Sequence, residues 1–338
     1  MATYREIKGF TIQSLSSDPA ADANTEGQVW YNTTSNTLKG ITTVTGAGAW
    51  AAGGALSGGD KRNATGIGGQ TAALCVMGTP SGGYPAVDTS VETYDGSTWT
   101  AAPSANTART NMGSNAIGSQ AAGQVMGGYT PGPTLNVISE QFNGTAWAEV
   151  GDLNTGRWSG AGGGTITAGF YVGGRPGTFN NSEIYNGLAW TAVNTLQDGR
   201  GYLSGGGPTT AGLVFGGGTP ETTLGKQTES WNGTSWSEVS DLNTARMYAA
   251  GICGTAAQTS SLYVGGQTPS TIGSVEQWNG TSWTEVADLT TARTQLTGNS
   301  AASTTAGLVV GGNSPASDAT EEWTVASPSI AVKTFTSS

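Results

Sequence analysis

Histidine is absent from this chain of 338 residues, and lysine, cysteine and long apolar runs are scarce. Without histidine the chain can form no Ser-His-Asp triad, no Cys-His dyad and no histidine-ligated zinc or copper site. The two cysteines, Cys75 and Cys253, lie in different parts of the chain with no CxxC spacing, which favours burial as small apolar side chains. We therefore expect no metal and no other cofactor.

Charge and hydropathy exclude further classes of partner. The 13 basic residues are outnumbered by 23 acidic ones, which gives a net charge of −10, and no basic run could follow a phosphate backbone. No apolar stretch approaches the ~18 residues of a membrane span, and the first residues lack the layout of a secretory signal. We expect a soluble protein that binds no nucleic acid and inserts into no membrane.

The dominant feature of the sequence is a repeat with a period of about 47 residues. Each copy contains an arginine, a glycine-bounded apolar run and a glutamate at the start of a Glu-x-aromatic triplet, and most copies add an Asn-Gly-x-x-Trp segment. The arginines are Arg62, Arg109, Arg157, Arg200, Arg246 and Arg293. The glutamates are Glu92, Glu140, Glu183, Glu229, Glu276 and Glu321. A repeat of this length is typical of the four-stranded blades of a β-propeller.

The fifth copy shows how the repeat predicts four strands. A stretch of small residues, Met247–Thr255, is followed by the apolar run Ser261–Val264, which ends at Gly265-Gly266. Asn279-Gly280 then lies between β-favouring residues, which is the strongest short-range signal for a type I′ hairpin. Small residues suit the innermost strand and large aromatics the outer ones, so we interpret the tryptophans of the repeats as core.

The two ends of the repeat predict how the ring closes. Trp50 precedes the first copy as other tryptophans precede theirs, and the last copy lacks its final Asn-Gly-x-x-Trp segment. The N-terminal strand should therefore complete the last blade and leave no open sheet edge. The expected fold is all-β, a six-bladed β-propeller over residues 50–338 with an N-terminal extension or anchor over residues 1–49. Residues 28–38, which resemble a further hairpin, and residues 330–333, which could form a terminal strand, leave a seven-bladed or doubly closed ring open.

Two interpretations are available for the repeated charges. Each arginine can hold a carboxylate or loop carbonyls with its planar fork and so fix the register of a blade. Alternatively, six arginines surround the channel mouth and bind an anion. The variable loops after the glycine pairs mark the candidate recognition face, where a glycan or a neighbouring subunit could bind. The candidate contacts there, which could equally be solvated loop residues, are Tyr84, Tyr129, Arg175, Phe179, Glu221 and Lys226.

From Trp50 to Trp323 the order of double glycine, Glu-x-aromatic and spaced tryptophan resembles kelch repeats. The spellings Glu-x-Trp-Asn-Gly-Thr-Ser-Trp and Leu-Asn-Thr-Ala-Arg, with Glu26–Asn32 near the start, are similar to kelch-type propellers in virion proteins of tailed bacteriophages. The chain lacks the adaptor domains of eukaryotic kelch proteins, and without histidine it cannot match the copper site of galactose-oxidase relatives.

This resemblance implies a non-enzymatic structural protein of a phage particle, located in the tail, nozzle or a fibre and assembled in the host cytoplasm. Residues 1–49 would dock to other virion proteins, several copies would be present in each particle, and the propeller loops would contact protein or host-surface glycan. Two alternatives stay open. Propellers also host glycan hydrolases that work with a carboxylate pair, and a soluble adaptor protein would have the same repeat.

Overall fold

The computed structural model describes residues 12–44, 46–80, 86–113, 117–132, 135–176, 180–218, 223–299 and 304–335. These residues form β-strands joined by turns and loops and contain no helix, so none of them forms a helix that could cross a membrane. Contacts divide the chain into two compact units, Gly48–Thr324 and a terminal unit made of Met1–Ala47 with Val325–Ser338.

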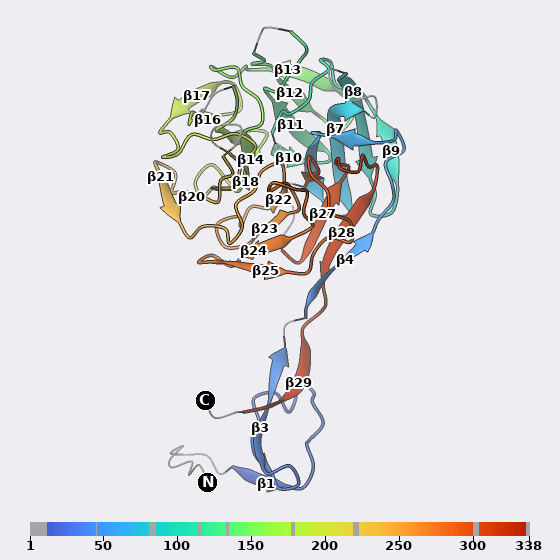
Figure 1. Ribbon diagram of the computed structural model, residues 1–338, viewed down its shortest axis with the longest axis vertical. Coiled ribbons are helices and arrows are strands. Elements are labelled where there is room, and N and C mark those ends of the chain that lie inside the picture. The colour runs from blue at the N-terminus through green and yellow to red at the C-terminus, as the bar shows by residue number, and fades with distance from the viewer. Residues whose placement is uncertain are drawn as a thin grey trace. The chain divides into compact units, whose positions relative to one another are not determined.

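The larger unit consists of successive sheets arranged around a centre (Figure 1), and all but the last are built only from neighbouring segments of the chain. The first sheet contains β5 (Lys61–Arg62), β6 (Thr65–Gly69), β7 (Ala72–Pro80), β8 (Asp88–Tyr94) and β9 (Trp99–Ala102). The second contains β10 (Ile117–Ser119), β11 (Ala122–Met126), β12 (Ser139–Phe142) and β13 (Trp147–Val150). The third contains β14 (Ala161–Thr165), β15 (Ala168–Val172), β16 (Ser182–Tyr185) and β17 (Trp190–Val193).

The remaining sheets of this unit follow the same order. The fourth contains β18 (Ser204–Gly206), β19 (Leu213–Phe215), β20 (Thr228–Trp231) and β21 (Trp236–Val239). The fifth contains β22 (Ala250–Cys253), β23 (Ser261–Val264), β24 (Val275–Trp278) and β25 (Trp283–Val286). The sixth contains β26 (Thr297–Gly298), β27 (Ala306–Val310), β28 (Thr320–Val325) and, as its last strand, β4 (Gly48–Ala52). The N-terminal strand of this unit thus lies beside β28, as the sequence predicts.

Neighbouring sheets are linked in a sequence that returns to its start. The innermost strands β6, β10, β14, β18, β22 and β26 contact one another in this order, and β26 also contacts β6. A backbone N–H at the end of the second strand of each sheet donates to a carbonyl of the next sheet; Gly266 N to Arg293 O, at 2.9 Å, is one such bond. The last sheet does the same to the first, through Gly312 N and Lys61 O at 2.7 Å. This repeated, antiparallel all-β arrangement is consistent with a β-propeller.

The glycine pairs allow this close approach. At Gly265 the φ angle is +62°, and an added Cβ would lie 2.8 Å from the Arg293 carbonyl oxygen of the next sheet. Left-handed backbone and lack of space together favour glycine. The first sheet has Met77 at the equivalent place, with φ +53°, so this position is strained for a residue with a side chain.

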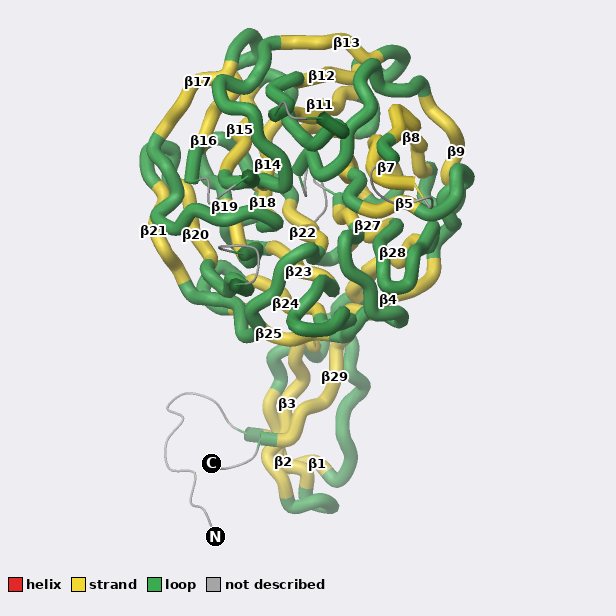
Figure 2. The backbone as a smooth tube through the Cα atoms, turned by 45° about the horizontal axis from the view of Figure 1, so that its top comes forward, coloured by secondary structure: helices red, strands yellow, loops and turns green. Residues whose placement is uncertain are grey.

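The hydrophobic core lies between the sheets. One cluster combines Leu74 and Val76 of the first sheet with Val125, Phe142 and Trp147 of the second. The outer strands β9, β13, β17, β21 and β25 follow the perimeter in Figure 2, and each begins with a buried tryptophan. The indole N–H groups of four of them donate to the preceding sheet, as from Trp236 to Ser182 Oγ at 3.0 Å, and that of Trp147 donates to Pro103 O just after β9. The tryptophans therefore belong to the core, as the sequence predicts.

The terminal unit is a separate sheet. Its strands are β1 (Gln13–Leu15), β2 (Val29–Asn32), β3 (Thr37–Val44) and β29 (Ser329–Thr334). The β2–β3 hairpin and β29 are the two segments that could have added a blade, and both lie in this unit. The sequence analysis placed residues 325–338 in the propeller, but β29 pairs with β3. The same two segments of chain are paired in both sheets: β28 with β4, and then β29, which follows β28, with β3, which precedes β4.

One carboxylate organises this small sheet. Asp18 accepts hydrogen bonds from Trp30 Nε1 at 3.2 Å and from Asn32 Nδ2 at 2.5 Å, and pairs with Lys39 Nζ at 2.8 Å. The bond from Lys39 and the bond from Asn32 hold the pKa of Asp18 below its usual value. These charge-assisted bonds link the loop that carries Asp18 to β2 and β3, beside the buried side chains of Trp30 and Ile41.

Candidate functional site

Most of the repeated arginines and glutamates form buried ion pairs inside single sheets. The pairs are Arg109–Glu140 (2.7 Å), Arg157–Glu183, Arg200–Glu229 (2.5 Å), Arg246–Glu276 (2.6 Å) and Arg293–Glu321 (2.7 Å). All five arginines are fully buried. Each arginine also donates to backbone carbonyls; Arg246 Nη2, for instance, donates to Tyr263 O at 3.0 Å. These guanidinium groups therefore join two strands of a sheet to the turn that precedes it.

The first sheet departs from this pattern. Glu92 lies 4.0 Å from Lys61 Nζ, and both side chains are buried. Arg62, which the sequence grouped with the other arginines, is the next residue along the chain and is half-buried. Lys61 and Arg246 occupy equivalent positions. Each lies two residues before a residue with a left-handed backbone, Asn63 after Lys61 and Tyr248 after Arg246.

The carboxylate oxygens of the repeated glutamates already accept hydrogen bonds from the protein. Glu276 Oε2 accepts the backbone N–H of Asn243 at 2.7 Å, and Oε1 accepts that of Thr244 at 3.2 Å. Burial lowers the pKa of the Arg109 guanidinium, and the charge of Glu140 opposes this shift. With both partners buried and bonded, the five arginines offer no surface to a dissolved anion. The expected alternative, an anion site made by a ring of arginines, does not agree with this burial.

The predicted loop contacts separate in space. Tyr129 and Arg175 each follow a glycine pair and lie beside the centre of the unit, where Trp158 N donates to Arg175 O at 3.0 Å. Lys226 is exposed on a loop and pairs with Asp241 at 3.2 Å. Tyr84, Phe179 and Glu221 lie outside the described residues.

A ring of six residues around the centre was not predicted. Each lies at the start of one sheet and has a left-handed backbone, with φ between +52° and +58°. The ring residues are Asn63, Asn111, Ser159, Tyr202, Tyr248 and Gln295. Their backbone N–H groups donate to the carbonyl of the preceding ring residue; Asn63 N donates to Gln295 O at 2.9 Å, which links the first sheet to the last. Five of these six links are present among the described residues.

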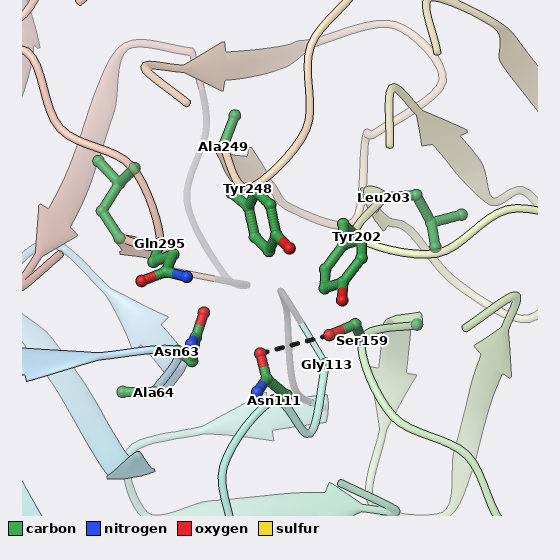
Figure 3. Close-up of a pocket in the computed structure, with 12 residues that line it drawn as sticks. Asn63, Ala64, Asn111, Gly113, Ser159, Tyr202, Leu203, Tyr248, Ala249 and Gln295 are labelled. Atoms are coloured by element: carbon green, nitrogen blue, oxygen red, sulfur yellow. Dashed lines mark hydrogen bonds between the residues drawn. The ribbon is translucent and has the colours of Figure 1, made fainter. Parts of the chain in front are cut away.

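The side chains of the ring converge on a pocket. In Figure 3, Tyr202 and Tyr248 lie side by side on one side of it, and Asn63 and Asn111 lie across from them. Ser159 Oγ is 3.4 Å from Asn111 Oδ1. The pocket narrows to a cavity of about 50 Å³ among these side chains, and a wider space of about 240 Å³ adjoins it. We name the wider space the central bowl. Arg62, Thr79 and Trp158 line it together with five ring residues, which are Asn63, Asn111, Tyr202, Tyr248 and Gln295.

One half of the central bowl is aromatic. The Tyr202 and Tyr248 rings have centroids 4.2 Å apart, and Trp158 lies edge-on to Tyr202 at 5.6 Å. Tyr129 packs behind Trp158 with ring centroids 6.0 Å apart. The Arg175 guanidinium lies 5.9 Å from the Trp158 ring and 5.7 Å from the Tyr202 ring, a cation–π arrangement that fixes both rings in place.

The other half is polar and carries one charge. Its side chains are the amides of Asn63, Asn111 and Gln295, the Thr79 hydroxyl and the Arg62 guanidinium. Among the described residues, Arg62 is the only charged residue that lines the bowl. Its side chain makes no ion pair and no hydrogen bond with a described residue. Asp60 lines a neighbouring cleft that Arg62 also borders. The bowl is thus positive in a chain whose net charge is −10.

The opposite mouth of the unit has a different character. A wide opening of about 600 Å³ is lined by glycine, alanine, serine and threonine from the turns after the innermost strands, with Gln70 and Ile166 as its larger side chains. No ionisable side chain lines it, and nowhere do the described residues gather three or more potential metal ligands. The central bowl is therefore the better candidate for specific recognition, because only there do aromatic, amide and charged groups converge.

The sequence of this chain matches no model of a known protein family and no curated protein.

Proposed function

We propose that this chain is a structural protein of a tailed-bacteriophage particle, in which a six-bladed propeller is a recognition head and the terminal unit is its anchor. The phage assignment rests on the resemblance of the repeat to kelch-type virion propellers, and the division into head and anchor rests on the strands where the two units join. The first strand of the large unit, β4, pairs with its last, β28. The propeller therefore begins and ends at one point of its perimeter, and both termini of the chain contribute to the terminal unit.

Six blades are supported by the hydrogen bonds that link neighbouring sheets. They run from each sheet to the next and from the sixth back to the first, through Gly312 N and Lys61 O. The ring residues repeat this order, with Asn63 N bonded to Gln295 O. A blade completed by strands from both ends of the chain resists opening, because separating it requires breaking a whole strand pair.

A binding role is favoured over hydrolysis by the use of the carboxylates. Glycoside hydrolysis needs two carboxyl groups that face the sugar about 5–9.5 Å apart. The repeated glutamates are instead buried against arginine or lysine and bonded to backbone N–H groups. The central bowl is lined by amides, hydroxyls, aromatic rings and Arg62. Such groups bind and orient a ligand, and several copies on one particle would multiply a weak affinity.

The test is mass spectrometry of density-gradient-purified particles from the source lysate, with the amount of this chain compared with that of the major capsid protein. We expect a fixed ratio well below one, as for a tail or fibre component. Recovery only in the soluble fraction would refute the virion assignment and favour a soluble adaptor.

A second arm tests the anchor. Trp30 is buried in the terminal unit and donates to Asp18, so Trp30→Ala should disrupt that unit and remove the chain from particles. Arg62→Gln lies in the other unit and is the matched control, for which incorporation should be unchanged. Equal incorporation of both variants would contradict docking through the terminal unit.

A further inference from the structure

We infer that the central bowl binds a single pyranose residue that carries a carboxylate, such as the terminal acidic sugar of a surface glycan. This inference deepens the proposed function and rests on it for the source of the glycan. It depends on three properties of the bowl that the described residues supply together: a cluster of three aromatic rings, a set of side-chain amides, and one guanidinium.

The aromatic face fits the apolar side of a sugar ring. The Tyr202 and Tyr248 rings are 4.2 Å apart at their centroids, and Trp158 stands edge-on beside them. The Tyr202 and Tyr248 rings, which are tilted by 46° to each other, present ring atoms and their hydroxyl groups to the pocket (Figure 3). Aromatic side chains that are held rigidly provide contact area at little cost in conformational entropy. The Arg175 guanidinium packs against both the Trp158 ring and the Tyr202 ring.

The amide side fits the hydroxyl groups of the same sugar. Asn63, Asn111 and Gln295 each present a donor and an acceptor, which matches neighbouring hydroxyls that donate and accept in turn. Gln295 Oε1 is buried and has no hydrogen-bond partner among the described residues. A buried acceptor without a partner is costly, and a ligand hydroxyl that donates to it removes that cost.

The charge of the bowl selects the class of sugar. Arg62 is half-buried next to Asn63 in the sequence, lines the bowl, and makes no ion pair with a described residue. Arginine binds a carboxylate through two parallel hydrogen bonds, which add geometric specificity to the charge. No carboxylate of the described chain lines the bowl to repel such a ligand.

The volume limits the ligand to one ring. At about 240 Å³, the bowl is smaller than the ~300 Å³ at which pockets for drug-sized ligands begin. An oligosaccharide would therefore enter with its terminal residue only. With so few contacts we expect dissociation constants of about 1–10 mM for one bowl, which repeated copies on a particle would convert into firm attachment.

The experiment is an NMR titration of the purified full chain with matched pairs of methyl glycosides. The glucuronoside is compared with the glucoside and the galacturonoside with the galactoside, because each pair differs only in a carboxylate against a hydroxymethyl group. The methyl glycoside of N-acetylneuraminic acid completes the panel. At least one acidic sugar should bind, about 10- to 100-fold more tightly than its neutral counterpart where it has one.

Variants assign the binding to the bowl. Arg62→Gln removes the charge and should lower the affinity for the acidic sugar to that for the neutral one. Trp158→Ala should weaken both members of a pair. Lys226→Gln, on an exposed loop that does not line the bowl, is the matched control and should bind as the unchanged protein does. The melting temperature of each variant reports whether it has folded.

Three results would overturn the inference: no acidic sugar binds, the acidic and neutral members bind equally, or Arg62→Gln and Lys226→Gln have the same effect. None of these results bears on whether the chain belongs to a phage particle, which the composition of purified particles decides. Conversely, a chain that is absent from particles but binds acidic sugars would retain the binding site and lose the proposed location.

Discussion

Replacing Arg246 with methionine should destabilise the larger unit by about 3 kcal/mol. Arg246 is fully buried, its Nη1 lies 2.6 Å from Glu276 Oε1, and its Nη2 donates to Tyr263 O at 3.0 Å. Breaking a buried pair by removing one partner costs about 3–5 kcal/mol, because the remaining charge stays buried without compensation. The lower end applies here, since Arg246 Nε has no hydrogen-bond partner among the described residues and Glu276 keeps its bonds to Asn243 and Thr244.

Two further variants separate charge from geometry. Arg246→Lys copies the first sheet, where Lys61 faces Glu92 at 4.0 Å; it should cost about 1–2 kcal/mol, mainly for the lost bonds to carbonyl oxygens. In Arg246→Met/Glu276→Gln, both charges are removed while the new amide still accepts the Asn243 N–H. The double variant should therefore be more stable than Arg246→Met alone.

The assay is urea unfolding followed by tryptophan fluorescence, with the midpoints compared at a common slope. Lys226→Gln is the control, because its pair with Asp241 is exposed and surface pairs contribute about 0–1 kcal/mol. The reasoning would be refuted if Arg246→Met cost less than about 1 kcal/mol. It would also be refuted if the stability lost in the double variant equalled the sum of the losses in Arg246→Met and Glu276→Gln measured separately.

Three other outcomes follow from buried groups. Trp236→Phe should cost about 1–3 kcal/mol in urea unfolding, because it removes the indole bond to Ser182 Oγ and part of the packing between two sheets. Burial raises the pKa of Tyr171 and of Tyr263 to about 12, above the value of about 10 in an unfolded chain. Stability should therefore be complete below about pH 10 and should fall as the pH rises through about 12, which unfolding midpoints and phenolate absorbance at alkaline pH would check. Burial also raises the pKa of the Cys75 thiol to about 11, so the native protein should resist iodoacetamide at about pH 8 while the unfolded chain reacts; labelling at equal rates in both states would contradict this.

The hairpins were predictable from local sequence, but their turn type was not. Trp278 pairs with Trp283, so four residues form the loop, and only Gly280 and not Asn279 has the positive φ that the expected two-residue type I′ turn needs at both positions. Asn279 Oδ1 accepts the backbone N–H groups of Thr281 and Ser282, both at 2.9 Å, and Gly280 has φ +98°. The residues that form this turn are adjacent in sequence, so the chemistry of the turn is visible in the letters themselves. The same holds for the apolar runs before the glycine pairs, which became strands such as β23.

The register of the first sheet was predicted incorrectly for a physical reason. Both Lys61 and Arg62 are basic, and either one fits the spacing of the repeat. Only the strand pairing shows that Lys61 lies beside Glu92 while Arg62 faces the bowl. One residue along a strand reverses the direction of a side chain, so an uncertainty of one position was enough to exchange a buried residue for a functional candidate.

The ring residues escaped prediction because they share a conformation and not a residue type. Asparagine, serine, tyrosine and glutamine take equivalent places at the centre, each with a left-handed backbone. The available signal was a variable position two residues after each buried basic residue, within a repeat that is otherwise strict. Variation at one fixed place of a structural repeat is typical of a surface that recognises a ligand.

The sequence by itself determined the strands, the positions of their hairpins, the all-β class and the pairing of the first strand of the larger unit with its last sheet, because these depend on residues close in sequence or on a count of repeats. Tertiary structure alone decided that β29 joins the terminal unit, that the repeated arginines are buried, and that Arg62, Trp158, Tyr202 and Tyr248 share one bowl. Residues from separate repeats meet there only because the sheets close around a common centre, and no single repeat contains that information.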